Sequence, residues 1–181
     1  MADSLSALEL GCVTRARRIA DLGAGPGFPG LALAVALPAA AVALVESQSR
    51  KTQVIERLAS AAGLRVEVLT ERAEALAVAR PGAFDLVTAR AVAPLAVLVE
   101  YAAPLLAREG CLVAWKGRRD PDEERAGVAA AAHTGLEQAS IEAVRPYPAA
   151  RNRHLHVFVK VSETPSRFPR RPGMAQKRPL S

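Results

Sequence analysis

The chain has 181 residues, which is enough for one well-buried domain and too few for two ordinary ones. Half of the residues are hydrophobic and only 4% are aromatic, a composition that suits buried strands and helices and excludes a chain that is disordered throughout. The formal net charge of +6 favours an anionic partner, with nucleic acid as the leading class and plain surface solubility as the alternative.

Two features of the sequence bear on where the protein resides. No stretch reaches the ~20 apolar residues of a membrane-spanning helix, because Pro38 and Glu46 interrupt the longest candidate. The N-terminal segment places its basic cluster after its apolar residues, which is not the order of a secretory signal peptide. We therefore expect a cytoplasmic protein with no membrane partner.

Short apolar runs alternate with helical patterns along most of the chain. The apolar runs predict strands over residues 17–21, 41–46, 64–71, 84–91 and 111–117. The segments between and after them predict helices over residues 28–37, 49–63, 93–110 and 120–132. Pro104 lies inside the third of these helices, so a kink or a break is expected there. Asp120 and Pro121 supply the cap and the first position of the fourth.

The last two predicted strands, residues 140–148 and 154–161, have no helix between them. The loop from Tyr147 to Arg153 is too short for a crossover helix, so these strands are expected to pair antiparallel. Alternating strands and helices otherwise imply a parallel sheet that is covered on both faces. The predicted fold is α/β and Rossmann-like, with a mostly parallel seven-stranded sheet that ends in an antiparallel hairpin pair.

The composition changes over residues 162–181, which contain four prolines, five basic residues and one acid. Such a segment is a poor core former and suits an arm that binds a polyanion, although a solvated tail without a partner fits equally well. We therefore predict one domain over residues 1–161, followed by a basic, proline-rich C-terminal tail.

The stretch "DLGAGPGFPG", residues 21–30, follows the first predicted strand. Its glycines suit a backbone that needs positive φ and that a ligand approaches closely. In an open parallel sheet the ligand site lies beyond the carboxyl ends of the strands, which is where this loop falls. Gly23, Gly25 and Gly27 are therefore candidate ligand-binding residues.

Two classes of ligand compete for this loop. Residues 25–30 match the G-x-G-x-x-G dinucleotide pattern, and Glu46 follows at a spacing that suits a ribose-binding acid. However, the turn begins at Gly23, and in that register the third glycine falls on Phe28. Pro26 and Pro29 also remove N–H groups that a pyrophosphate would need. S-adenosylmethionine has no phosphate, and Asp21 and Glu46 offer carboxylates for its ammonium and its ribose.

The sequence resembles the glucose-inhibited division protein B family of bacteria. The matching stretches stand in family order and are "DLGAGPGFPG" (21–30), "LVESQSRKTQVIERL" (44–58), "ERAEAL" (71–76), "FDLVTARAVAPL" (84–95), "WKG" (115–117), "RHLHVFVK" (153–160) and "PRRPGMAQKRPL" (169–180). The resemblance implies an S-adenosylmethionine-dependent methyltransferase fold and an enzyme that methylates N7 of a guanine in 16S ribosomal RNA.

The resemblance also implies roles for particular residues. Gly23 and Phe28 contact the cofactor, Ala73 and Glu74 lie beside its adenine, and Arg90 reaches into the site. Family members normally carry an N-terminal helical region of several dozen residues before the first strand, and residues 1–10 resemble only its last part. We expect the remaining helices of that region to cover the sheet and to support the cofactor pocket.

Guanine N7 carries a lone pair and no proton, so its methylation needs positioning rather than a general base. A donor to O6 alone would orient the base without blocking N7, and Arg90 and Lys116 are the candidates for this catalytic role. We expect no metal. His154 and His156 alternate with apolar residues, so we expect them on an outward face.

We expect the protein to be a monomer. Its basic residues outside the pocket are expected to contact the 16S RNA or the 30S subunit. These candidates are Arg50, Lys51, Arg118, Arg119, Arg151, Arg153, Arg170, Arg171 and Lys177. Two other functions stay open on the sequence alone: a nicotinamide-dependent oxidoreductase and a non-catalytic RNA-binding domain.

Overall fold

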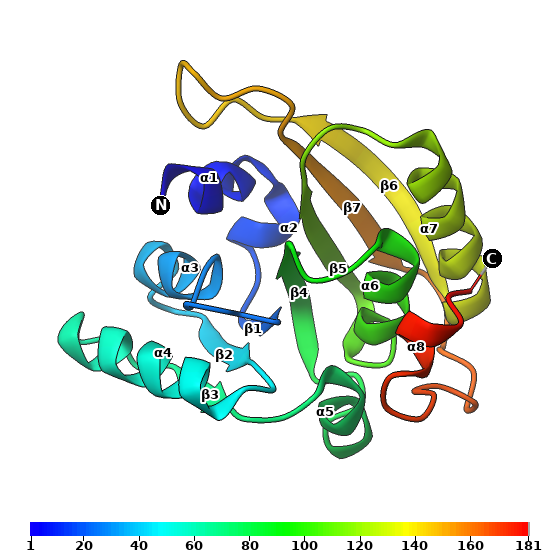
Figure 1. Ribbon diagram of the computed structural model, residues 1–181, viewed down its shortest axis with the longest axis horizontal. Helices are drawn as coiled ribbons and strands as arrows, with labels where there is room; N and C mark the ends of the chain where they lie inside the picture. Colours follow the sequence, from blue (N-terminus) through cyan, green and yellow to red (C-terminus); the bar gives the residue numbers. More distant parts are fainter. Residues whose placement is uncertain (181) are drawn as a thin grey trace.

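The structure is a computed structural model that describes residues 1–180 (Figure 1). Its centre is a seven-stranded sheet with the strand order β3-β2-β1-β4-β5-β7-β6. The strands are β1 Arg18–Leu22, β2 Ala41–Val45, β3 Glu67–Leu69, β4 Phe84–Arg90, β5 Leu106–Lys116, β6 Leu136–Ala143 and β7 His154–Lys160. The first five strands pair in parallel, and β7 runs antiparallel to both of its neighbours, β5 and β6. The predicted fold class is therefore confirmed.

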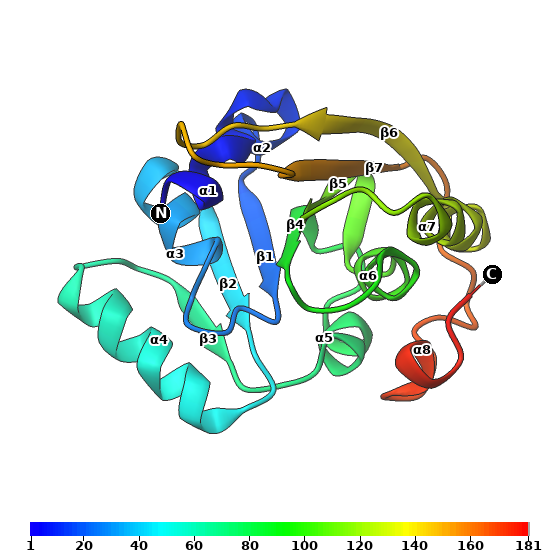
Figure 2. The ribbon, with the colours of Figure 1, turned by 45° about the horizontal axis from the view of Figure 1, so that its top comes forward.

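Helices cover both faces of the sheet (Figures 1 and 2). In chain order they are α1 Ala2–Leu5, the 3-10 helix η1 Ser6–Glu9, α2 Gly11–Thr14, α3 Gly30–Ala36, α4 Ser49–Ala61, α5 Ala73–Ala79, α6 Leu95–Ala102, α7 Pro121–Thr134 and α8 Met174–Lys177. One apolar cluster packs η1, α2, α3 and α4 against the sheet, and the other packs α5 to α8 against its opposite face. No helix of residues 1–180 is long and apolar enough to cross a membrane.

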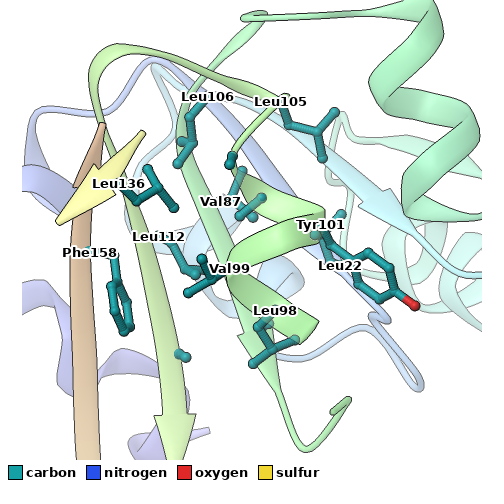
Figure 3. Close-up of a cluster of buried hydrophobic side chains, with 14 of the residues drawn as sticks. Leu22, Val87, Leu98, Val99, Tyr101, Leu105, Leu106, Leu112, Leu136 and Phe158 are labelled. Atoms are coloured by element: carbon teal, nitrogen blue, oxygen red, sulfur yellow. The ribbon is translucent and has the colours of Figure 1, made fainter. Parts of the chain in front are cut away.

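Helix α6 is the centre of the second cluster. All eight of its residues are buried, as expected for a helix that is apolar on nearly every side. Figure 3 shows Leu98 and Val99 of this helix beside Val87 of β4, Leu112 of β5 and Phe158 of β7. Each fully buried side chain of this size contributes about 1.5–3 kcal/mol, so this helix anchors the centre of the sheet.

The helix predicted over residues 93–110 is wrong in its second half. Helix α6 ends at Ala102, and the chain enters β5 at Leu106. Pro104 has no N–H to continue the helix, so a turn in which the Leu105 N–H donates to the Ala102 carbonyl takes its place. The break predicted at Pro104 is confirmed, but β5 begins five residues before the predicted start.

Strand β7 has both faces covered, which corrects the expectation for the histidines. His156 is only 1% exposed and lies close to Glu123 and Glu124 of α7. Burial lowers the pKa of its imidazole below the usual value, so it is neutral near pH 7. His154 lies at the start of the strand, where its Nδ1 is 2.8 Å from the Gly117 carbonyl oxygen. Neither imidazole stands on a free outward face.

Residues 162–180 lie against the domain. Phe168 and Ala175 are buried, and α8 packs beside α6. Arg170 holds the buried carboxylate of Glu100 through two hydrogen bonds, one of them 2.6 Å long from Nε to Oε1. The N–H of Gly173 donates to Glu74 at 2.8 Å. This segment is therefore not a solvated tail, because it supplies partners that two buried carboxylates need.

Candidate functional site

The glycine loop after β1 adopts the conformation that its sequence requires. Gly23, Gly25 and Gly27 have φ values of +60°, +56° and +101°. A Cβ atom at Gly23 would also lie 2.6 Å from a methyl group of Val92, so the space beside the loop is closed to a side chain. The predicted need for positive φ is confirmed.

The backbone N–H groups of this loop are already used within the protein. Gly25 donates to Glu46 at 3.1 Å, and Gly27 and Phe28 donate to the carbonyl of Ala24. At the start of α3, the N–H of Gly30 donates to Asp21 at 2.8 Å. A pyrophosphate is held by free N–H groups at such a helix start. These bonds, with the two prolines of the loop, therefore disfavour a dinucleotide and suit a ligand without phosphate.

A cavity of about 480 Å³ opens beside this loop, at the carboxyl ends of β1, β2 and β4. A volume of this size is typical of a site for a small molecule or cofactor. Residues from six stretches of the chain line it: Leu22, Gly23, Ala24, Gly25, Pro26, Phe28, Val45, Glu46, Ser47, Gln48, Lys51, Glu71, Arg72, Ala73, Glu74, Arg90, Ala91, Val92, Tyr101 and Gln176. The structure thus brings together most of the residues proposed for cofactor binding.

Asp21 is placed differently from the expectation. Its carboxylate is fully buried and lies outside the cavity, where it accepts hydrogen bonds from Gly30 N–H and Thr88 Oγ1, both at 2.8 Å. Burial raises its pKa to about 7, although these two bonds and the charge of Arg90 act in the opposite direction. It therefore fixes the start of α3 and the course of the loop, and it does not line the cavity. Gly27 is likewise buried outside the cavity lining, against Leu31 and Ile55.

Glu46 lies in the cavity wall, one residue beyond the end of β2. Its Oε2 accepts from Gly25 and its Oε1 accepts from the N–H of Gln48 at 3.0 Å. A carboxylate offers about four acceptor positions, so free lone pairs remain for a ligand. This fixed acid at the end of the second strand occupies the place where such folds bind a ribose.

Five other residues of the cavity come from four further elements. Ala73 and Glu74 begin α5, and Arg90 ends β4. Tyr101 and Gln176 also line the cavity, and the sequence alone did not indicate either of them. Burial, followed by the charge of Glu74, raises the pKa of Tyr101 to about 12, so its hydroxyl is a neutral hydrogen-bond donor.

Lys116 lies outside this cavity, in a second one of about 370 Å³ beside it. Its ammonium forms an ion pair with Glu123 and donates to the Ala93 carbonyl at 3.3 Å. Arg90 and Ala91 line both cavities, and Ala91 has a φ of +57°, which is uncommon for a residue with a side chain. Arg90 therefore lies at the boundary between the two cavities.

The basic residues proposed for RNA contact differ in their surroundings. Most are exposed: Arg50, Lys51, Arg118, Arg119, Arg151, Arg153, Arg171 and Lys177. Arg119 is paired with Glu124, and Lys51 lies 3.9 Å from Glu46 at the cavity wall. Arg170 is engaged with the buried Glu100, which removes it from this surface set.

The model of one protein family, described as "GidB: rRNA small subunit methyltransferase G", matches residues 1–155. The chain belongs to the GidB family. It is 40% identical to the ribosomal RNA small subunit methyltransferase G of Rubrobacter xylanophilus, over 98% of this chain and 70% of that protein. It is 42% identical to the protein of the same name from Chloroflexus aggregans, over 92% of this chain and 71% of that protein.

Solved structures agree with the fold of this GidB-family chain. A predicted O-methyltransferase from Agrobacterium tumefaciens aligns with a TM-score of 0.66 at 28% identity, over 89% of this chain and 81% of that one. An S-adenosylmethionine-dependent O-methyltransferase from Thermotoga maritima aligns with a TM-score of 0.67 at 17% identity, over 89% of this chain and 65% of that one. The resemblance drawn from the sequence motifs is confirmed, and a nicotinamide-dependent oxidoreductase is not favoured.

Proposed function

We propose that this protein transfers the methyl group of S-adenosylmethionine to N7 of a guanine in the 16S RNA of the small ribosomal subunit. The observation that carries this proposal is the cavity at the carboxyl ends of β1, β2 and β4 in a chain of the GidB family. Its loop has no free N–H groups at Gly25, Gly27 or Phe28 for a phosphate, and a fixed carboxylate stands where a ribose binds.

The residues present fit S-adenosylmethionine. Glu46 would accept the ribose hydroxyls, and the loop at Gly23 and Gly25 would lie along the middle of the cofactor. Ala73 and Glu74 would lie beside the adenine, with Phe28 on the loop side of the cavity. Asp21 supports this arrangement from outside the cavity, because it accepts the Gly30 N–H and so holds the start of α3.

The bound cofactor supplies an electrophilic methyl group on a sulfonium. Guanine N7 has a lone pair and no proton, so the protein's task is to hold the base in line and to exclude water, which is catalysis by positioning. N7 methylation also places a positive charge on the guanine ring. Carboxylates near the base therefore stabilise the product-like transition state.

Arg90 suits a positioning contact with guanine O6 better than Lys116 does. Its side chain lines both cavities, and its Nη1 has only long contacts, at 3.4 Å, with Asp3 and Ser4. The ammonium of Lys116 is already held by Glu123. A donor that binds O6 from the boundary between the cavities leaves N7 free for methyl transfer.

The RNA backbone would be bound by exposed cations around the two cavities. Lys51 lies at the wall of the first cavity and Arg153 at the wall of the second. Arg50, Arg118, Arg151, Arg171 and Lys177 extend this surface. Because each phosphate contact releases a counterion, affinity for the RNA should fall steeply with salt.

Two measurements test the proposed function. Calorimetric titration should show binding of S-adenosylmethionine and none of NAD. Incubation with methyl-labelled cofactor and 30S subunits or 16S RNA that lack the modification should label the RNA. Borohydride and aniline treatment, which cuts RNA at 7-methylguanosine, should then cut the labelled RNA at one site. Binding of NAD, or labelling without this cleavage, would contradict the proposal.

A further inference from the structure

The second cavity lies where five separate segments meet. They contribute Asp3 of the N-terminal helix, Arg90 at the end of β4, Trp115 and Lys116 at the end of β5, Val144 after β6, and Arg153 before β7. The loop between β6 and β7 runs beside the N-terminal helices in both views (Figures 1 and 2). The cavity adjoins the proposed cofactor site through Arg90, so anything bound in it would lie next to the cofactor.

The carboxylate of Asp3 is incompletely satisfied in this cavity. Its Oδ1 is buried and accepts no hydrogen bond from any residue among 1–180. The nearest cation is Arg153, whose Nε lies 3.8 Å away, and Oδ2 is 3.4 Å from Arg90 Nη1. Leaving a buried acceptor without a donor costs free energy, so such atoms in native proteins call for an explanation. The Asp3 side chain is 25% exposed as a whole, so a ligand that brings N–H donors to the carboxylate would supply one.

The position of Asp3 is held by its backbone and not by its carboxylate. The indole N–H of Trp115 donates to the Asp3 carbonyl at 2.8 Å, and Ser6 Oγ donates to the same oxygen at 2.8 Å. The side chain is therefore placed firmly while its carboxylate makes only long contacts. This combination is typical of a binding residue whose partner is a ligand.

We propose that the second cavity binds the target guanine, with Asp3 accepting from N1–H and the 2-amino group while Arg90 donates to O6. The inference rests on the proposed function and adds the residue that selects the base. Guanine presents O6, an acceptor, beside N1–H, a donor. Arg90 offers a donor for O6, and Asp3 beside it offers an acceptor for N1–H.

Adenine presents the opposite order, with a 6-amino donor beside the N1 acceptor. In this cavity its amino group would meet the Arg90 guanidinium, and its N1 lone pair would face the Asp3 carboxylate. Both polar groups of the protein would then be left unpaired, which is the strongest way for a site to reject a ligand. The pair of residues would therefore discriminate guanine from adenine without any contact at N7.

The same arrangement assists the reaction. On guanine, N7 and O6 lie side by side, so a base bound through O6 by Arg90 has its N7 edge towards the boundary with the first cavity. N7 methylation makes the ring cationic, and the hydrogen bond from N1–H to the Asp3 carboxylate grows stronger as this charge develops. Lys116 adds little opposing charge because Glu123 neutralises it.

The chain's single tryptophan, Trp115, makes the inference directly measurable. The protein, saturated with S-adenosylhomocysteine, is titrated with GMP, IMP and AMP while the fluorescence of Trp115 is recorded. GMP should bind at least about tenfold more tightly than AMP, with IMP in between because it lacks the 2-amino group. Equal affinity for GMP and AMP, or no binding of either, would overturn the proposal.

Variants assign the preference to Asp3. Asp3→Asn and Asp3→Ala should lose most of the preference for GMP while their affinity for S-adenosylhomocysteine and their unfolding temperature stay unchanged. Glu9→Gln, which removes one exposed carboxylate from the same N-terminal segment, is the matched control and should behave like the wild type. If Asp3→Asn keeps the wild-type preference, Asp3 does not read the base.

A parallel assay of methyl transfer separates this inference from the proposed function. Asp3→Asn should lower kcat/KM on 16S RNA by about tenfold or more, in line with a lost charged hydrogen bond. Wild-type activity together with an equally active Asp3→Asn would refute the guanine site and leave the proposed function standing. A wild type that labels no RNA would refute the proposed function, whereas the nucleotide titrations would still decide the guanine site.

Discussion

The Glu46 carboxylate accepts the backbone N–H of Gly25 at 3.1 Å and thereby joins the end of β2 to the glycine loop after β1. Its other oxygen accepts the N–H of Gln48, just before α4 begins. One side chain thus fixes two of the walls of the cofactor cavity. The only further hydrogen bond to this side chain within residues 1–180 is a long one of 3.5 Å from Ser47 Oγ, so the carboxylate retains acceptor positions for the ribose of the proposed cofactor.

Replacing this acid should therefore weaken cofactor binding. Glu46→Gln would point an amide N–H₂ group at one of the two backbone N–H groups and would remove the charge. A hydrogen bond to a charged group is worth about 1.5–3 kcal/mol, so affinity for S-adenosylmethionine should fall by roughly 10–150-fold in calorimetry. Glu56→Gln, at an exposed position of α4, is the control. Equal affinities for these two variants would remove Glu46 from the site.

A side chain at Gly23 should damage both the loop and the cofactor site. Gly23→Ala would hold an alanine at φ +60° and place its Cβ 2.6 Å from Val92. The strain should cost about 1–3 kcal/mol in urea unfolding, and calorimetry should show loss of cofactor affinity. Gly63→Ala shares the positive φ, +65°, but has open space around it. That control should lose about 1 kcal/mol of stability and keep its affinity.

The sheet could be predicted from the sequence because parallel strands with two covered faces are mostly apolar runs, as β2 is throughout and as β1 and β4 are at most of their positions. The positions of the acids were harder to predict. Asp21 lies within β1, in register with Leu44 and Thr88, and its side chain is therefore buried below the sheet edge. Glu46 follows the last residue of β2 and reaches the cavity. Glu46 stands two register positions beyond Asp21, and this difference decides between the two outcomes.

Long-range partners account for the remaining errors. The C-terminal segment has the composition of a solvated tail, and only the structure shows that Arg170 meets the buried Glu100, 70 residues away. Tyr101 and Gln176 enter the cavity from α6 and α8, which no local motif connects to the glycine loop. Such contacts depend on tertiary packing, which neither spacing nor periodicity records.

The buried carboxyl of Asp21 should give the protein a measurable pH dependence. Its pKa of about 7 in the folded state lies above the usual 3.8, so the unfolded chain releases this proton first as the pH rises. The carboxyl therefore lowers the free energy of unfolding progressively between pH 4 and 7. Asp21→Asn lacks this effect, and its stability relative to the wild type should rise by roughly 2–4 kcal/mol over that range.

The measurement is urea unfolding of both proteins at several pH values, with calorimetric titration of the cofactor alongside. Asp21 lies outside the cavity, so Asp21→Asn should keep its affinity for S-adenosylmethionine. Asp85→Asn should show a pH dependence of stability, relative to the wild type, of the opposite sign. Burial acts to raise the pKa of Asp85, but its bonds with Arg18 and the Arg17 N–H outweigh this and lower it, so that variant should lose relative stability as the pH rises towards 3.8 and show no further change between pH 4 and 7. A pH-independent difference for Asp21→Asn would contradict the assignment.

Docking of the C-terminal segment should support cofactor binding. Arg170→Ala would leave the carboxylate of Glu100, which is 3% exposed, without its cation. Breaking a buried pair in this way costs about 3–5 kcal/mol, so the segment should detach and take Gln176 out of the cavity wall. Trypsin should then cut after Arg167 and Lys177 faster than in the wild type, and affinity for S-adenosylmethionine should fall. Arg171→Ala removes an exposed cation from the same segment, and its cofactor affinity and the rate of cutting at Lys177 should stay at wild-type levels. Equal protection of Lys177 in the two variants would show that the Arg170–Glu100 pair does not hold the segment in place.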